Sequence, residues 1–142
     1  MAEANAKPIA QALQLITQSQ GAVLLHSSAG KDRTGVVCAL AMMLCDVPTA
    51  AIASDFALSQ GFKEMLYTSE VADTRERVLR RLKDDTPELG ASASTMVAFA
   101  QAFTARHGSV ATWLAEHTNF GAEGVRRLRA RLLQPTAALE MS

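Results

Sequence analysis

The sequence predicts an α/β fold with one strand, residues 22–26, and about five or six helices. The strand is predicted from four consecutive apolar residues, Ala22 to Leu25, a run typical of a short buried strand. The helices are predicted from apolar residues that recur every three or four positions. A lone strand has unpaired N–H and C=O groups on both edges and cannot form a sheet. We therefore expect the remaining strands to come from an N-terminal segment absent from this chain or from a separate polypeptide.

The boundaries of the helices follow from residues that favour helix starts and stops. Pro8 fits a first helical turn, and Pro48 ends a helix because it disfavours helical geometry in the residue before it. Thr49 and Ser109 are predicted N-caps, and Gly108 is a predicted stop. The predicted helices span residues 3–19, a stretch opened by Thr34 and Gly35, and residues 49–59, 69–84, 95–106 and 122–133, with a further short helix over residues 110–117.

The helix predicted over residues 69–84 is locally basic, and its charges allow two interpretations. The simpler one is a solvated face near acidic partners such as Glu76. The other is that some of these side chains border a phosphate site and attract acidic substrates or inositol headgroups. The basic residues are Arg75, Arg77, Arg80, Arg81 and Lys83.

Composition indicates a single domain, residues 1–142, with an ordinary globular core. The 14 basic and 14 acidic residues cancel, which argues against general nucleic-acid binding. No apolar run reaches the roughly 20 residues of a membrane span, and the polar N-terminus lacks a signal-peptide core, so we expect a cytoplasmic protein. Cys38 and Cys45 lie about 10 Å apart on one helix, too far for a disulfide, and we expect both to be buried and reduced.

The segment with the clearest functional pattern is residues 26–35, HSSAGKDRTG. A strand, a tight loop and a helix N-terminus in succession form an anion cradle, because loop N–H groups point inward and the first helical turn adds its own. Arg33 lies where loop and helix meet, and its guanidinium can bind two oxygens of one phosphate. A nucleotide-binding P-loop would need Ser or Thr after Lys31, where Asp32 stands.

This segment resembles the signature of the cysteine-dependent phosphatases, His-Cys-x5-Arg-(Ser/Thr)-Gly, with His26, Ser27, Arg33, Thr34 and Gly35 at the named positions. The run Ala-Gly-Lys-Asp-Arg-Thr-Gly is similar to a narrower group, the atypical tyrosine and lipid phosphatases. The flanking phrases IASDFALS, RHGSVATWL and LRARLL resemble phrases of the same group, so the likeness covers nearly the whole chain. It implies the C-terminal half of such a domain.

The resemblance also implies a role for each loop position. Ser27 occupies the nucleophile position, Asp32 would be the acid that protonates the leaving group, and Arg33 would steady the transition state. Asp32 has the alternative role of a loop-bracing acceptor, and Lys31 is either a second positive charge at the mouth or a solvated lysine. Phosphate binding is assigned to Ser28, Ala29, Gly30, Lys31, Arg33 and Thr34, and loop support to His26 and Gly35.

Ser27 decides the expected activity, because an alcohol ionises far less readily than a thiol and this cradle offers it no neighbouring base. One interpretation is a phosphatase for phosphotyrosine, other phosphoresidues or phosphoinositides, inactive or substrate-trapping because its cysteine is replaced. The alternative is a natural pseudophosphatase that binds phosphate or serves assembly. No metal-ligand spacing is present, and neither a metal nor a cofactor is expected. The expected partners are a phosphorylated protein or phosphoinositide and a second polypeptide.

Overall fold

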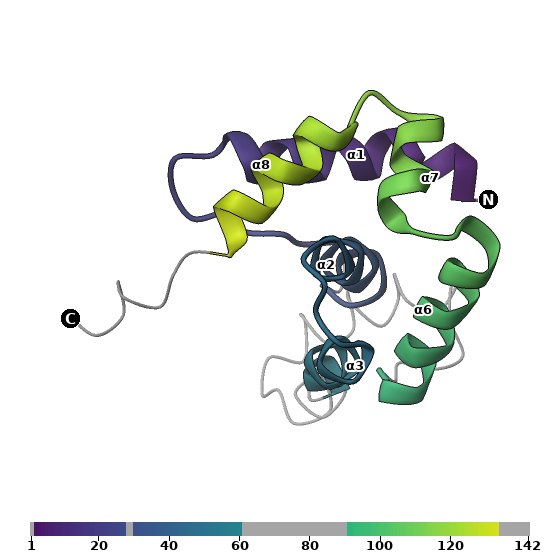
Figure 1. Ribbon diagram of the computed structural model, residues 1–142. Coiled ribbons are helices and arrows are strands. Elements are labelled where there is room, and N and C mark those ends of the chain that lie inside the picture. Colours follow the sequence, from purple (N-terminus) through teal and green to yellow (C-terminus); the bar gives the residue numbers. More distant parts are fainter. Residues whose placement is uncertain (1, 28–29, 61–90, 134–142) are drawn as a thin grey trace.

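A computed structural model describes residues 2–27, 30–60 and 91–133. Within these residues the chain forms helices, and a longer loop separates the first two (Figure 1). The elements are α1 (Ala2–Gln18), α2 (Asp32–Leu44), α3 (Thr49–Ala57), the 3-10 turn η1 (Leu58–Gln60), α6 (Ala93–His107), α7 (Val110–His117) and α8 (Ala122–Leu132).

Helix α2 lies in the middle of the described structure, between α1, α7 and α8 on one side and α3 and α6 on the other (Figure 1). Its residues Leu40 and Leu44 join a core cluster with the fully buried Trp113 and Leu128. On its other side Ala39 joins a second cluster that α3 and α6 supply, built around Ile52, Phe56 and Met96. Helix α2, which begins within residues 26–35, is therefore fixed by packing on both sides.

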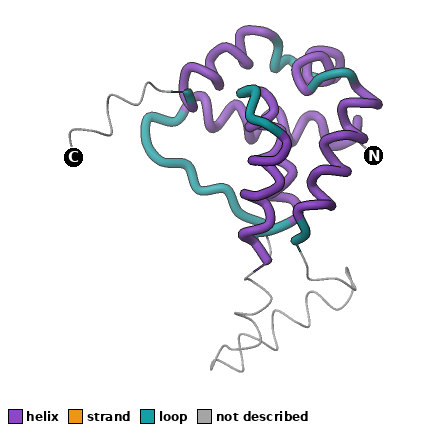
Figure 2. The backbone as a smooth tube through the Cα atoms, turned by 60° about the horizontal axis from the view of Figure 1, so that its bottom comes forward, coloured by secondary structure: helices purple, strands orange, loops and turns teal. Residues whose placement is uncertain are grey.

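The predicted strand at residues 22–26 is wrong. The structure gives residues 22–27 no regular secondary structure, and no strand occurs in the described residues. Figure 2 shows this segment as a loop that runs from α1 to α2. A strand exists only where a neighbouring segment pairs with it, and within the described residues none lies alongside. The apolar run is not buried as predicted either: Val23 is 40% exposed and Leu24 85% exposed, and only Leu25 packs against the core.

The α/β fold class is therefore corrected to a helical arrangement, within the part of the chain that is described. The expectation of a completing N-terminal segment or second polypeptide is not supported by the described residues, which form no sheet to complete. The predicted helices over residues 3–19, 49–59, 95–106, 110–117 and 122–133, and the one opened by Thr34, are confirmed to within a few residues. The predicted basic helix 69–84 lies outside the described residues. None of the described helices is long and apolar enough to cross a membrane.

Side-chain caps fix the starts of two of these helices. Ser109 accepts a hydrogen bond from the backbone N–H of Thr112 at 3.0 Å, as predicted. Ser92, which the sequence analysis did not single out, accepts one from the N–H of Thr95 at 3.1 Å. Gly108 ends α6 with φ of 72°, as its position predicted. Thr49 is not a cap, because Pro48 takes the N-cap position of α3.

Replacing Ser109 with alanine should lower the free energy of unfolding by about 1 kcal/mol, because the Thr112 N–H loses its acceptor. Urea denaturation measures the change. Ser54→Ala is the matched control, since the Ser54 hydroxyl donates to the Ala50 carbonyl within α3 and caps no helix start. Equal effects of the two substitutions would contradict a capping role for Ser109.

Candidate functional site

The two ends of the predicted loop meet through a pair of hydroxyl groups. Thr34 Oγ1, in the first turn of α2, donates a hydrogen bond to Ser27 Oγ at 3.2 Å, across seven residues of sequence. Both side chains are half-buried. This contact places Ser27 at the start of α2. Ser28 and Ala29, which complete the loop, lie outside the described residues.

The N-terminus of α2 has no side-chain cap among the described residues. Lys31 occupies the N-cap position, and the first hydrogen bond of the helix runs from the Gly35 N–H to the Lys31 carbonyl at 2.6 Å. The N–H groups of the first turn, which have no partner within a helix, are therefore not taken by a cap of the kind seen at Ser92 and Ser109. Such a helix start favours an anion through its N–H groups and its dipole.

Two glycines serve the loop for different physical reasons. Gly30 has φ of +63°, in the left-handed region where a side chain is strained, so it permits the turn that leads into α2. Gly35 permits close packing instead, because a Cβ at this position would lie 2.7 Å from two ring carbons of Phe56. These contacts agree with the predicted supporting role of Gly35 and identify its partner, which the local sequence did not show.

The three charged residues of the loop differ in exposure. The side chain of Lys31 is only 4% exposed, and its Nζ lies 3.3 Å from Asp32 Oδ1, whereas the Asp32 side chain is 63% exposed. Arg33 and His26 are exposed. Lys31 therefore lies beneath the surface and not at a solvated mouth, while Asp32 and Arg33 lie where a ligand can reach them.

Neither Cys38 of α2 nor Cys45, which directly follows this helix, has the lowered pKa of a reactive thiol. Burial raises the pKa of the half-buried Cys38 thiol, and the Asp55 carboxylate raises it further. Burial also raises the pKa of the Cys45 thiol, with Arg129 opposing the change. A thiol with a raised pKa stays protonated near neutrality and is a poor nucleophile. Both cysteines are free, as expected, although only Cys45 is fully buried.

The sequence analysis missed two long-range contacts made by α8. Arg129 Nη1 donates to the Leu44 carbonyl at 3.2 Å, and Arg131 Nη2 donates to the Gly21 carbonyl at 2.8 Å. The acceptors are backbone carbonyls more than 80 residues away, so no local pattern could have revealed them. No group of three or more His, Cys, Asp or Glu side chains within the described residues could hold a metal ion.

Comparison with known proteins places this arrangement in context. The model of a family described as the tyrosine phosphatase family matches residues 1–134. A tyrosine-protein phosphatase from Nostoc commune is 43% identical over 51 residues, which are 36% of this chain and 17% of that protein. The chain thus matches under a fifth of the length of this relative. No solved structure matches significantly.

Proposed function

This chain belongs to the tyrosine phosphatase family, and from that premise we propose that residues 26–35 form the phosphate-binding loop of a phosphomonoester hydrolase. The observation that carries the proposal is the hydrogen bond from Thr34 to Ser27, which closes the loop over the uncapped start of α2. A phosphate at that start would accept hydrogen bonds from backbone N–H groups of the first turn of α2, and it would meet the positive end of the helix dipole.

The proposal gives each charged residue of the loop a role. Arg33 is exposed in the first turn of α2 and binds two phosphate oxygens through its guanidinium fork. Asp32, also exposed, protonates the leaving oxygen. The side chain of Lys31 is buried and does not lie at the mouth of the site. It supplies positive charge from beneath the surface and forms a 3.3 Å ion pair with Asp32. His26 and Gly35 support the loop.

Ser27 makes this form a phosphate binder with little or no turnover, because its hydroxyl stays protonated where a thiolate would attack. The substrate is a phosphotyrosine, another phosphoresidue or a phosphoinositide headgroup, all of which present the same phosphate monoester to the loop. The second candidate function is that of a pseudophosphatase, a phosphate-binding module that never had turnover. Ser27 itself favours it, and turnover by a Ser27→Cys form decides between the two.

Binding of inorganic phosphate to the full chain tests the shared part of both proposals. Arg33→Ala should raise the dissociation constant at least about tenfold, because a charge-assisted bidentate contact is lost. Arg106→Ala is the matched control, since Arg106 is an exposed arginine in the last turn of α6, outside the loop. Isothermal titration calorimetry measures both variants. Phosphate binding that is absent, or equally weak in both variants, would contradict a phosphate loop at residues 26–35.

A further inference from the structure

The segment that leads into the loop, residues 21–27, is held without a sheet. Within the described residues it pairs with no strand, so its position depends on other contacts. Leu25 packs against the core, and at the other end the Gly21 carbonyl accepts a hydrogen bond from Arg131 at 2.8 Å. We call residues 21–27 the loop arm. Among the described residues, this hydrogen bond links the loop arm to α8, 110 residues later in the chain.

Helix α8 and the loop arm also line one cavity. Leu132 and Arg131 border a cavity of about 360 Å³ together with Val23 and Leu25 of the loop arm. Cys38 and Met42 of α2 line the same cavity. The end of α8, the loop arm and α2 therefore meet around one cavity.

A second arginine of α8 holds the far end of α2. Arg129 Nη1 donates to the Leu44 carbonyl at 3.2 Å, and its Nη2 forms an ion pair with Asp46. Leu44 is the last residue of α2, where carbonyls lack partners within the helix, and a cation there also meets the negative end of the dipole. Asp46 has a φ of 57°, so this contact also fixes a backbone turn that few side chains adopt.

From these contacts we propose that Arg129 and Arg131 are positioning residues for the phosphate loop. Two positions apart on a helix, their side chains leave about 200° apart around the axis, so one rigid helix can reach both the end of α2 and the start of the loop arm. Leu128, which is fully buried, anchors α8 in the core. The pair fixes the loop arm relative to α2, and with it Ser27 relative to Thr34. This inference rests on the proposed phosphate loop.

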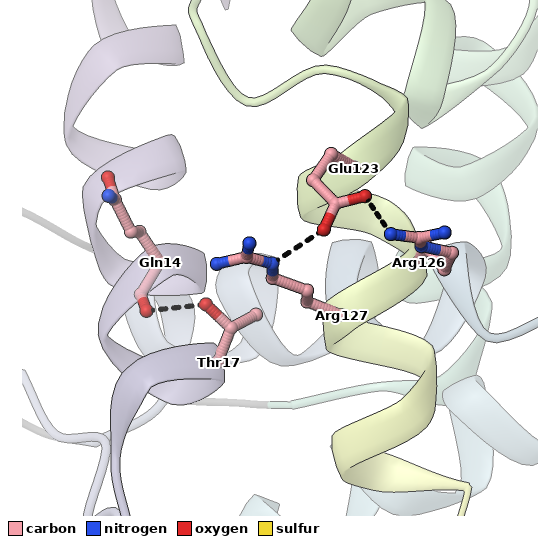
Figure 3. A network of polar contacts seen from close by, with 5 residues as sticks. All are labelled: Gln14, Thr17, Glu123, Arg126 and Arg127. Atoms are coloured by element: carbon pink, nitrogen blue, oxygen red, sulfur yellow. Dashed lines mark hydrogen bonds and ion pairs between the residues drawn. The ribbon is translucent and has the colours of Figure 1, made fainter.

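The same helix provides matched controls. Arg126 and Arg127 both bind Glu123 on α8 itself, and they lie 77% and 67% exposed. Figure 3 shows these ion pairs beside Gln14 and Thr17 of α1. The hydrogen bond from Arg127 holds the pKa of Glu123 below its ordinary value. Within the described residues, the ion pairs of both arginines are with Glu123, so replacing either one removes similar charge without removing the contacts that Arg129 and Arg131 make.

The experiment compares Arg131→Met and Arg129→Met with Arg126→Met and Arg127→Met in the full chain. Inorganic phosphate is the probe, and the amide signals of Ser27 and Thr34 in ¹⁵N spectra report loop geometry without ligand. We expect Arg131→Met and Arg129→Met to weaken phosphate binding about three- to tenfold and to shift both amide signals. The two controls should do neither. In the Ser27→Cys background kcat should fall for p-nitrophenyl phosphate, measured well below each melting temperature.

A conservative pair separates positioning from a general loss of stability. Arg131→Lys should recover most of the binding, because one carbonyl needs one donor, whereas Arg129→Lys should recover less, since its two contacts use separate nitrogens. Amide signals of Ser27 and Thr34 that stay unshifted in Arg131→Met, or shift equally in Arg126→Met, would overturn the proposal. Failure of the parent chain to bind phosphate would refute the proposed function instead, and the ligand-free amide signals would still test the positioning role.

Discussion

The Ser27→Cys form of this chain should hydrolyse p-nitrophenyl phosphate on the order of 10³-fold or more faster than the chain with serine. The uncapped N-terminus of α2 favours negative charge at residue 27, which lowers the pKa of a thiol there and leaves a serine hydroxyl protonated. Phosphate release followed by absorbance of p-nitrophenolate gives the two rates under identical conditions.

The expected reaction of the Ser27→Cys form has two steps. The sulfur at position 27 bonds to phosphorus as the bond to the leaving oxygen breaks, and that oxygen keeps the electron pair and takes a proton from Asp32. Water then attacks the phosphoenzyme, gives a proton back to Asp32, and releases phosphate and the thiolate. Thr34 Oγ1, which donates to residue 27 at 3.2 Å, stabilises that departing thiolate.

Two controls accompany this substitution. Ser54→Cys adds a thiol on the exposed face of α3 and should leave the rate unchanged. Ser27→Ala should bind inorganic phosphate and release none from the ester. A Ser27→Cys form that binds phosphate without turnover would exclude the hydrolase and leave the phosphate-binding module as the function of the loop.

The described helices were predictable because their signals are local. Periodic apolar residues and a cap such as Ser109 act within one or two turns, and the structure realises them where the spacing places them. The absence of a strand at residues 22–26 could not be predicted from Ala22 to Leu25. Four apolar residues favour burial, but they do not show whether another segment is available to pair with them. With no pairing segment among the described residues, Leu24 is left 85% exposed.

Within the site, too, some features were predictable from the sequence and others were not. The proximity of Ser27 and Thr34 was predictable, since the loop spacing and the helix start place both residues at one helix end. The burial of Lys31 was not, because a lysine beside an aspartate reads as a surface pair unless the surrounding packing is known. The contacts of Arg129 and Arg131 depend on where α8 docks, which is set by core packing of residues such as Leu128 and not by the arginines themselves.

Gly35→Ala should lower the free energy of unfolding by about 1 kcal/mol, although alanine is the better helix former. Within a helix, alanine gains up to about 1 kcal/mol over glycine. The new Cβ would meet two ring carbons of Phe56 at 2.7 Å, far inside the roughly 3.5–4.0 Å optimum for carbon atoms. Overpacking of this kind costs about 1–3 kcal/mol, and Phe56 is buried between α2, α3 and α6, so the clash outweighs the helix preference.

Urea denaturation of Gly35→Ala, Phe56→Leu and the double variant identifies the cause. If the ring is the obstacle, Phe56→Leu costs less in the Gly35→Ala background than alone, with a coupling of about 1 kcal/mol. Gly21→Ala, where nothing lies within 4 Å of the added carbon, should change stability by less than about 0.5 kcal/mol. Additive effects would show that Gly35 is not needed for the approach of α2 to α3. Coupling would instead tie the start of the phosphate loop to the second core cluster, so that packing at Phe56 sets the position of Thr34.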